Sequence, residues 1–257
     1  MDRLWAALVA FLREFSWPRA LWYLAAAAFA TSALGVAAGN RWLLPALDVA
    51  AILPAWWWAR RERSVQATAF ILLFWAFWKA VALAFMTTLL PTRAAAAVAF
   101  GPRFADQTLT WLRTGELAPA LGPWLVLKAA AAVFALSLVT GGVGGLVAAA
   151  MLLNCQAYVL GLLLTRTVAP VKVLALGWPL WYIFLALGLV NLLLAASEPL
   201  GGRMARRPFR PAETRDAFFV AVLMCVAAYL AQVYLAPWYQ EVLGPVVIFD
   251  PAALTGL

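Results

Sequence analysis

The stretch LVTGGVGGLVAAAMLLNCQAYVLG, Leu138 to Gly161, decides how the chain is threaded. It lies in an apolar run that is too long for one helix and is interrupted by four glycines: Gly141, Gly142, Gly144 and Gly145. Glycine permits tight turns, so the stretch predicts two helices joined by a turn or a re-entrant break. The alternative is one continuous helix, with its first and last glycines in a close GxxxG contact. That alternative would reverse the direction of every downstream segment.

The composition indicates the environment of these helices. Of the 257 residues, 66% are hydrophobic and only 12% are charged, which is more apolar surface than a soluble core of this length can hide. We therefore expect an all-α polytopic transmembrane bundle that forms a single domain over residues 1–257. The opening run carries charges and does not resemble a cleaved signal. Residues 1–18 form either an interfacial helix or a cytoplasmic extension of the first span.

About seven spans follow from taking roughly 20 apolar residues as one crossing. They are placed at residues 20–38, 42–59, 66–90, 123–139, 146–165, 173–197 and 216–236. With the N-terminus inside, eleven of the 19 Lys and Arg residues fall on the inner side, six fall outside, and Lys79 and Lys128 lie within spans. This bias predicts the N-terminus in and the C-terminus out, and it favours a turn at the glycines.

Two connecting segments are long enough to have a character of their own. Residues 91–122 form an outer loop, in which Phe104, Trp111 and Leu112 predict a short interfacial helix. Residues 198–215 mix Gly, Pro and Arg and predict an irregular basic inner loop, which either anchors the topology or docks a cytoplasmic partner. The net charge of +8 is dispersed over such loops and requires no nucleic-acid partner.

The residues needed for most enzyme chemistry are missing. The chain has no histidine, which removes the usual haem ligand, the commonest zinc ligand and the imidazole of a catalytic triad. Cys155 and Cys225 lie in separate predicted spans, where buried thiols act as small apolar groups. No nucleotide-binding fingerprint and no acidic metal cluster is present. We therefore assign no catalytic, cofactor-binding or metal-binding residues and expect that the protein is not an enzyme.

Four polar side chains inside predicted spans are the candidate site residues: Asp48, Lys79, Asn154 and Gln156. Asp48 and Lys79 lie about fourteen and sixteen residues from the middle of the inner turn that joins their spans, so in an antiparallel hairpin they reach similar depth. An unpaired charge in lipid costs at least about 2.5–3.5 kcal/mol, so the two are expected to face each other or a wet cavity. They form either a structural ion pair or a substrate or proton site, and Pro45 and Pro54 could open the backbone around Asp48. Asn154 and Gln156 either hydrogen-bond between helices or line a pore.

A family resemblance rests on the order of two segments, KAAAAVFALSLVTGGVGGLVAAAMLLNCQAYVLG and then LALGWPLWYIFLALGLVNLLLA, over about residues 128–196. A glycine-rich segment, an Asn-containing helix that ends near a Gly, and a Pro-marked following helix resemble the membrane core of stage II sporulation protein M-like proteins. Cys155 stands where that family has a Gly after the Asn, and no His flanks Pro179. The resemblance implies a non-catalytic multi-span protein that assembles with other envelope proteins.

These patterns lead to two hypotheses about function. The first is a non-catalytic integral membrane subunit or scaffold of a larger complex in the bacterial inner membrane or envelope, in contact with the lipid bilayer and with other membrane proteins or further copies of itself. The second is a transporter or channel for an ion or small solute, which would use the four intramembrane polar residues and the glycine break.

Overall fold

The computed structural model describes residues 16–62, 64–116, 122, 124–204 and 209–249. Within these ranges the chain is helical and forms no strand, and one isolated bridge pairs Thr167 with Val247. The helices are α2 (Trp17–Ala38), α3 (Leu43–Glu62), α4 (Val65–Leu89), α5 (Pro91–Ala97), α6 (Gly101–Thr114), α7 (Trp124–Thr140), α8 (Val143–Thr165), α9 (Pro170–Leu176), α10 (Leu180–Met204), α11 (Pro211–Leu243) and the 3-10 turn η1 (Gly244–Val246).

The expectation of an all-α membrane bundle is confirmed at the level of fold class. Five segments of the described chain are long and apolar enough to cross a membrane: Trp17–Ala38, Val65–Leu89, Val143–Thr165, Pro170–Leu200 and Pro211–Val246. α7 is equally apolar but has only 17 residues. α3 ends in the charged sequence Arg60-Arg61-Glu62. Helices therefore occupy the predicted ranges, while a count of seven crossings goes beyond what these lengths show.

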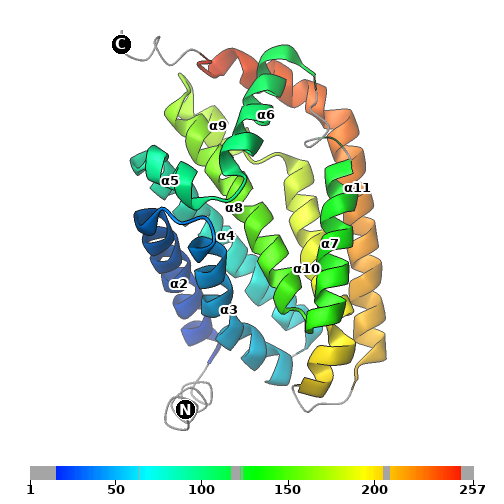
Figure 1. The fold of residues 1–257 in the computed structure, drawn as a ribbon. Helices are drawn as coiled ribbons and strands as arrows, with labels where there is room; N and C mark the ends of the chain where they lie inside the picture. The colour runs from blue at the N-terminus through cyan, green and yellow to red at the C-terminus, as the bar shows by residue number, and fades with distance from the viewer. Residues whose placement is uncertain (1–15, 63, 117–121, 123, 205–208, 250–257) are drawn as a thin grey trace.

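α8 runs through the middle of the bundle (Figure 1). It packs against α4 and α3 on one side and against α7 on the other. α2 covers α3 and α4, while α10 packs against both α7 and α11. The amphipathic α6 lies across one end of the bundle and contacts α8 (Figure 1). The side chains between these helices form one continuous apolar core.

Local sequence accounts for where several helices begin and end. Proline occupies the first turn of α2, α5, α6, α9 and α11, where its missing N–H has no helical partner to lose. At the start of α4 the Ser64 hydroxyl accepts a hydrogen bond from the Ala67 N–H at 3.2 Å. The Val65 N–H donates to Glu213 Oε2 at 2.8 Å, so the starts of α4 and α11 are held together.

The helix predicted over residues 173–197 is interrupted. α9 ends at Leu176 and α10 begins at Leu180, with Gly177-Trp178-Pro179 between them. Proline has no N–H to donate and disfavours helical backbone at the residue before it, which accounts for the break. The segment Pro170–Leu200 is consequently a broken helix.

The connecting segments are more helical than expected. The loop predicted at residues 91–122 contains α5 and α6, and α6 includes the residues from which a short helix was predicted. α10 continues past Glu198 and through Pro199 to Met204, so an irregular loop over the whole of 198–215 is wrong. Helix also resumes at Pro211. The predicted interfacial helix at residues 1–18 lies outside the described residues except for its last three.

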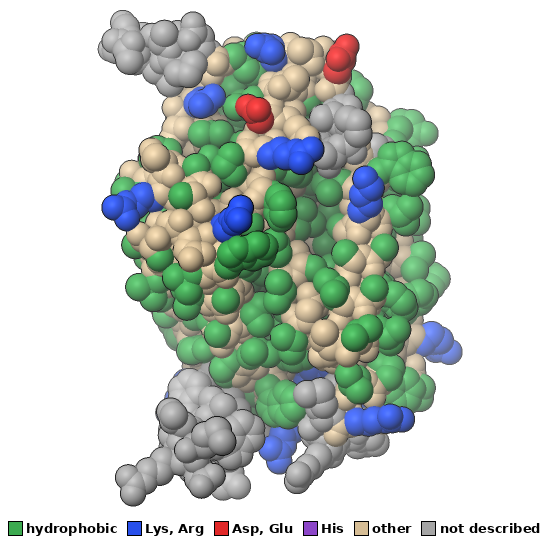
Figure 2. Space-filling model, in the orientation of Figure 1, with side chains coloured by type: hydrophobic (Ala, Val, Ile, Leu, Met, Phe, Trp, Pro, Cys, Tyr) green, Lys and Arg blue, Asp and Glu red, His purple; other side chains and the backbone are tan. Residues whose placement is uncertain are grey.

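The surface has the distribution that a membrane requires. Figure 2 shows a belt of hydrophobic side chains around the middle of the molecule, with Lys and Arg side chains toward its two ends. α11 contributes strongly to this belt, since Phe218, Phe219, Tyr229, Tyr234 and Trp238 are all exposed. Such a surface is stable in lipid and would associate in water.

Candidate functional site

The centre of the bundle contains an ion pair. Lys79 Nζ on α4 lies 2.6 Å from Asp48 Oδ1 on α3, and both side chains are 0% exposed. α3 remains helical through Pro54, so the prolines near Asp48 do not open its backbone. The geometry therefore brings the two charges together inside packed helices rather than at a break.

Two further side chains complete the polar cluster around this pair. Asn154 Nδ2 on α8 donates to Asp48 Oδ2 at 2.8 Å, and Lys79 Nζ donates to Thr31 Oγ1 on α2 at 3.2 Å. Asn154 is 2% exposed and Thr31 is 6% exposed. We call Thr31, Asp48, Lys79 and Asn154 the four-helix cluster, because α2, α3, α4 and α8 each contribute one member. Thr31 was not among the predicted site residues, although a threonine beside Ser32 in an apolar span is a visible signal.

The four-helix cluster compensates its own charge. The carboxylate and the ammonium neutralise each other, and the hydroxyl and amide satisfy further hydrogen-bonding capacity of each ion. In surroundings of low dielectric this attraction is strong, and loss of either partner would leave an uncompensated charge. Because no member is more than 6% exposed, the cluster is almost entirely enclosed by the surrounding helices. The arrangement can hold four helices in register, but it offers no exposed group to a solute.

A second buried ion pair was missed from the sequence. Arg60 near the end of α3 forms a 2.8 Å ion pair with Glu198 of α10, and the two side chains are 3% and 2% exposed. Arg60 Nη1 also donates to Ser197 Oγ at 2.7 Å, and the guanidinium lies 4.9 Å from the centroid of the Trp56 ring. The predicted span limits leave Arg60 and Glu198 in inner loops, where both would be hydrated. The sequence does carry one signal for this buried ion pair, because Ser197 and Glu198 directly follow a long apolar run.

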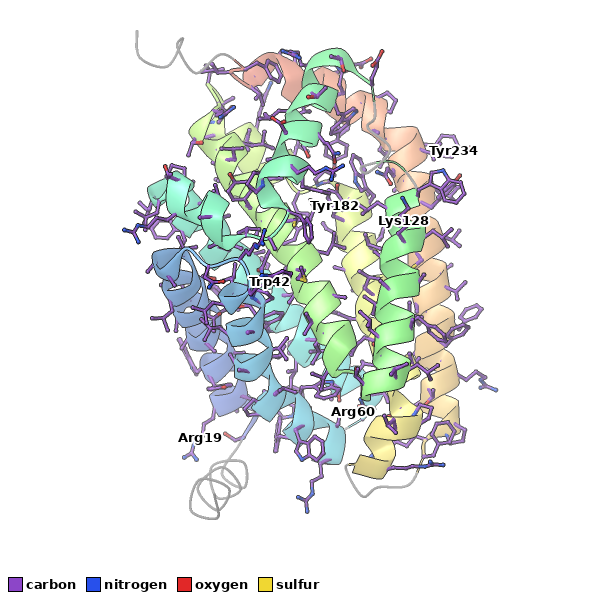
Figure 3. The ribbon with its side chains drawn as sticks, viewed as in Figure 1. Arg19, Trp42, Arg60, Lys128, Tyr182 and Tyr234 are labelled. Atoms are coloured by element: carbon purple, nitrogen blue, oxygen red, sulfur yellow. The ribbon has the colours of Figure 1, made fainter. Side chains whose placement is uncertain are left out.

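Gln156 lies apart from the other predicted site residues. It is two residues beyond Asn154, and a helix turns by about 200° over two residues, so the two amides leave α8 on opposite sides. Asn154 joins the four-helix cluster, whereas Gln156 lines a cavity between α4, α8 and α10. Tyr182 lines the same cavity, and its side chain lies between α8 and α10 in Figure 3. The structure thus unites three of the four predicted polar residues and separates the fourth.

The glycine stretch forms a turn between α7 and α8. Gly141 and Gly142 have φ values of 65° and 107°, and the Gly142 N–H donates to the Ser137 carbonyl at 3.0 Å. The alternative of one helix through the stretch is therefore wrong. Gly144 and Gly145 belong to α8, and a Cβ atom at Gly145 would collide with Ser137 Oγ of α7. Gly145 therefore allows α7 and α8, the two helices joined by this turn, to approach each other closely.

The two cysteines are both free thiols and differ in burial. Cys155 is buried, and its Sγ donates to the Ala99 carbonyl at 3.2 Å. Cys225 is half-buried on α11, and neither forms a disulfide. Among the described residues, no group of three or more His, Cys, Asp or Glu side chains comes together in a way that could hold a metal ion.

The fold and the site together indicate an α-helical protein of membrane-spanning type, and within the described part of the chain the buried charged side chains form two ion pairs. No family model matches the chain, and comparisons with curated proteins and with solved structures found no match. The two ion pairs and the cavities are therefore the features of this chain that bear on its function.

Proposed function

We propose that the protein is a non-catalytic integral membrane subunit or scaffold of a larger complex in the bacterial inner membrane or envelope. The observation that carries this proposal is the four-helix cluster, in which both ions are 0% exposed and are bound to each other. A transport or proton site built on these two charges needs them to be within reach of a solute or water. A sealed and neutralised pair instead supports a rigid frame.

A groove beside α10 supports the idea of a partner. α10 packs against both α7 and α11, and the groove of 740 Å³ is lined by residues of all three helices. Its lining includes the small residues Ala130, Ala131 and Ala221 as well as the larger Phe134 and Phe218. Small residues allow close helix packing in membranes, so this groove suits a helix of another membrane protein.

The proposed topology has seven crossings, with the N-terminus inside and the C-terminus outside. Arg19 and Arg60 lie toward the same end of the molecule (Figure 3), as expected if that end is cytoplasmic. The resemblance of residues 128–196 to stage II sporulation protein M-like proteins adds an envelope complex as the setting. Both statements rest on sequence patterns that are compatible with the fold.

Transport of a small solute is the second candidate, and a different observation favours it. Gln156 and Tyr182 line two cavities, of 70 Å³ and 20 Å³, next to the break at Gly177-Trp178-Pro179. Broken helices beside polar side chains are a recurrent feature of transporter sites. This reading would place the route at Gln156 and leave the four-helix cluster as its support.

Site-specific photo-crosslinking tests the subunit proposal. A photoreactive amino acid replaces Val226, which lines the groove and is 50% exposed, or Leu34 on α2, which is 61% exposed and provides the matched control. In native membranes we expect Val226 to give one crosslinked species of defined mass that contains a second polypeptide, and Leu34 to give none. Identical patterns at both positions, or no crosslink at Val226, would contradict a partner in the groove.

A further inference from the structure

The cavity between α4, α8 and α10 has a volume of 70 Å³ and lies away from the two ion pairs. At one end it is bounded by Leu72, Leu146 and Leu193, and it extends along α8 as far as Gln156. The ten residues from Leu146 to Gln156 correspond to about 15 Å of helix, so the cavity is elongated along the helices. This volume exceeds the roughly 10–15 Å³ that a single water needs, so the cavity has room for a few water-sized groups.

Three residues that line this apolar cavity carry hydrogen-bond donors that lack a well-placed acceptor among the described residues. Among the described residues, Gln156 Nε2, Trp75 Nε1 and Trp178 Nε1 are each buried and have no acceptor in good hydrogen-bond geometry, and the Tyr182 hydroxyl lies beside the Gln156 amide. Gln156 is 9% exposed and Trp75 is 5% exposed. An indole nitrogen can only donate, so an acceptor that enters the cavity and reaches one of these N–H groups would satisfy it.

The lining also restricts the charge of what can enter. No residue that lines the cavity carries a charge, and the remaining wall consists of Leu, Val, Ala and Tyr side chains. An anionic phosphate or carboxylate would lose its hydration without a compensating cation, at a prohibitive cost. A neutral acceptor such as an ester, amide or quinone carbonyl meets both requirements.

We propose that this cavity is a binding site for the carbonyl-bearing end of a neutral lipid chain, with the carbonyl oxygen accepting from Gln156 and the adjoining methylenes lying among the leucines. The site would hold a chain segment rather than a whole lipid, in keeping with its volume. It is separate from the groove between α7 and α11, so it stands whether or not a partner protein occupies that groove.

Photoaffinity labelling of the purified chain in detergent micelles tests this site. The probe is a long-chain fatty methyl ester with a diazirine on a carbon close to the ester, and its control is a hydrocarbon of the same length with the diazirine at the same carbon. We expect the ester to label peptides that contain Gln156 or Trp178 about fivefold more than the hydrocarbon does, which is the effect of about one hydrogen bond. Mass spectrometry of the labelled peptides measures this ratio.

Two variants and a control make the test specific. Gln156→Leu removes the donor at similar size and should abolish the preference for the ester, whereas Ala149→Leu narrows the cavity and should reduce labelling by both probes. Ala30→Leu on the exposed face of α2 should change neither, and thermal unfolding of each variant shows whether it is folded. Labelling spread evenly over the outer helix faces, or an equal preference for the ester in Gln156→Leu, would overturn the proposal. If Gln156→Leu fails to fold, the response of Ala149→Leu decides the outcome.

Discussion

At the scale of single residues, Lys79 shows how contacts with neighbouring side chains can stabilise a charge inside the membrane-spanning bundle. Its ammonium is fully buried, yet it lies 2.6 Å from the Asp48 carboxylate and donates to Thr31. Each of these contacts comes from a different helix, so the energy of desolvation is offset only when α2, α3 and α4 are all in place. Asn154 extends the same condition to α8.

Neutralising one member of the pair should be worse than neutralising both. We expect Asp48→Asn or Lys79→Met alone to lower the free energy of unfolding by about 3–5 kcal/mol, because the partner charge is left buried. The double variant should recover at least half of that loss. Thermal unfolding of the four proteins in the same detergent measures the coupling.

A matched pair at the surface provides the control for this cycle. Arg215 and Asp216 form a 3.5 Å ion pair with side chains 81% and 61% exposed, so neutralising either should leave stability nearly unchanged. Equal damage in the single and double variants of Asp48 and Lys79 would show that the pair is not the source of the stability.

The sequence reveals part of this residue-level arrangement. Equal depth in an antiparallel hairpin is enough to pair Asp48 with Lys79, because helical rise is constant. The contact of Arg60 with Glu198 depends on how α3 packs against α10, far along the chain, and no local pattern encodes that distance. Gln156 was grouped with Asn154 because both are polar, although their separation along the helix already places them on opposite faces.

At the level of elements, the turn between α7 and α8 is the feature that makes the rest of the bundle possible. Gly142 has a φ of 107°, and a Cβ atom there would lie 2.8 Å from the Trp56 ring and 3.0 Å from Ser197 Cβ. The turn is thus packed against the helices that carry the Arg60 and Glu198 pair. Positive φ and close packing both require a residue without a side chain.

Alanine substitutions should separate the roles of Gly142 and Gly144. Gly142→Ala should destabilise the protein by about 1–2 kcal/mol from backbone strain, with a further about 1–3 kcal/mol from overpacking. Gly144 is helical, and its nearest neighbours are side chains of Thr140 and Leu136, so helix propensity offsets much of the cost of Gly144→Ala. Thermal unfolding midpoints provide the comparison, and a Gly144→Ala variant less stable than Gly142→Ala would contradict this account.

The extent of most helices could be predicted from apolar length, because a membrane sets a minimum number of apolar residues. The break at Gly177-Trp178-Pro179 was missed because hydropathy stays high across it, and only the backbone restriction of proline marks it. The continuation of α10 to Met204 was missed for the opposite reason, since Gly, Pro and Arg there resemble a loop.

For the whole molecule, orientation in the bilayer follows from the number of crossings. A reporter fused after Leu257 should be active on the outer side of the membrane if the N-terminus is inside and seven segments cross. A cytoplasmic reporter would mean an even number of crossings. In that case either the shorter α7 or the charged α3 would be the helix that does not cross the membrane.

The proposed function makes the whole molecule one part of a larger assembly. The ion pairs stabilise the bundle internally, and the groove between α7 and α11 remains on its outer surface. Assembly should therefore be unaffected by removing charge from the interior, provided the chain still folds. This separates a scaffold from a transporter that uses the Asp48 and Lys79 charges themselves, in which removing them would abolish activity.

The mass of the particle extracted from native membranes under gentle conditions tests the central claim most directly. We expect both the wild-type chain and its Asp48→Asn, Lys79→Met double variant to be recovered in the same particle, with a second polypeptide in fixed ratio. A particle that contains only copies of this chain, in both proteins, would contradict the proposal that it is a subunit of a larger complex.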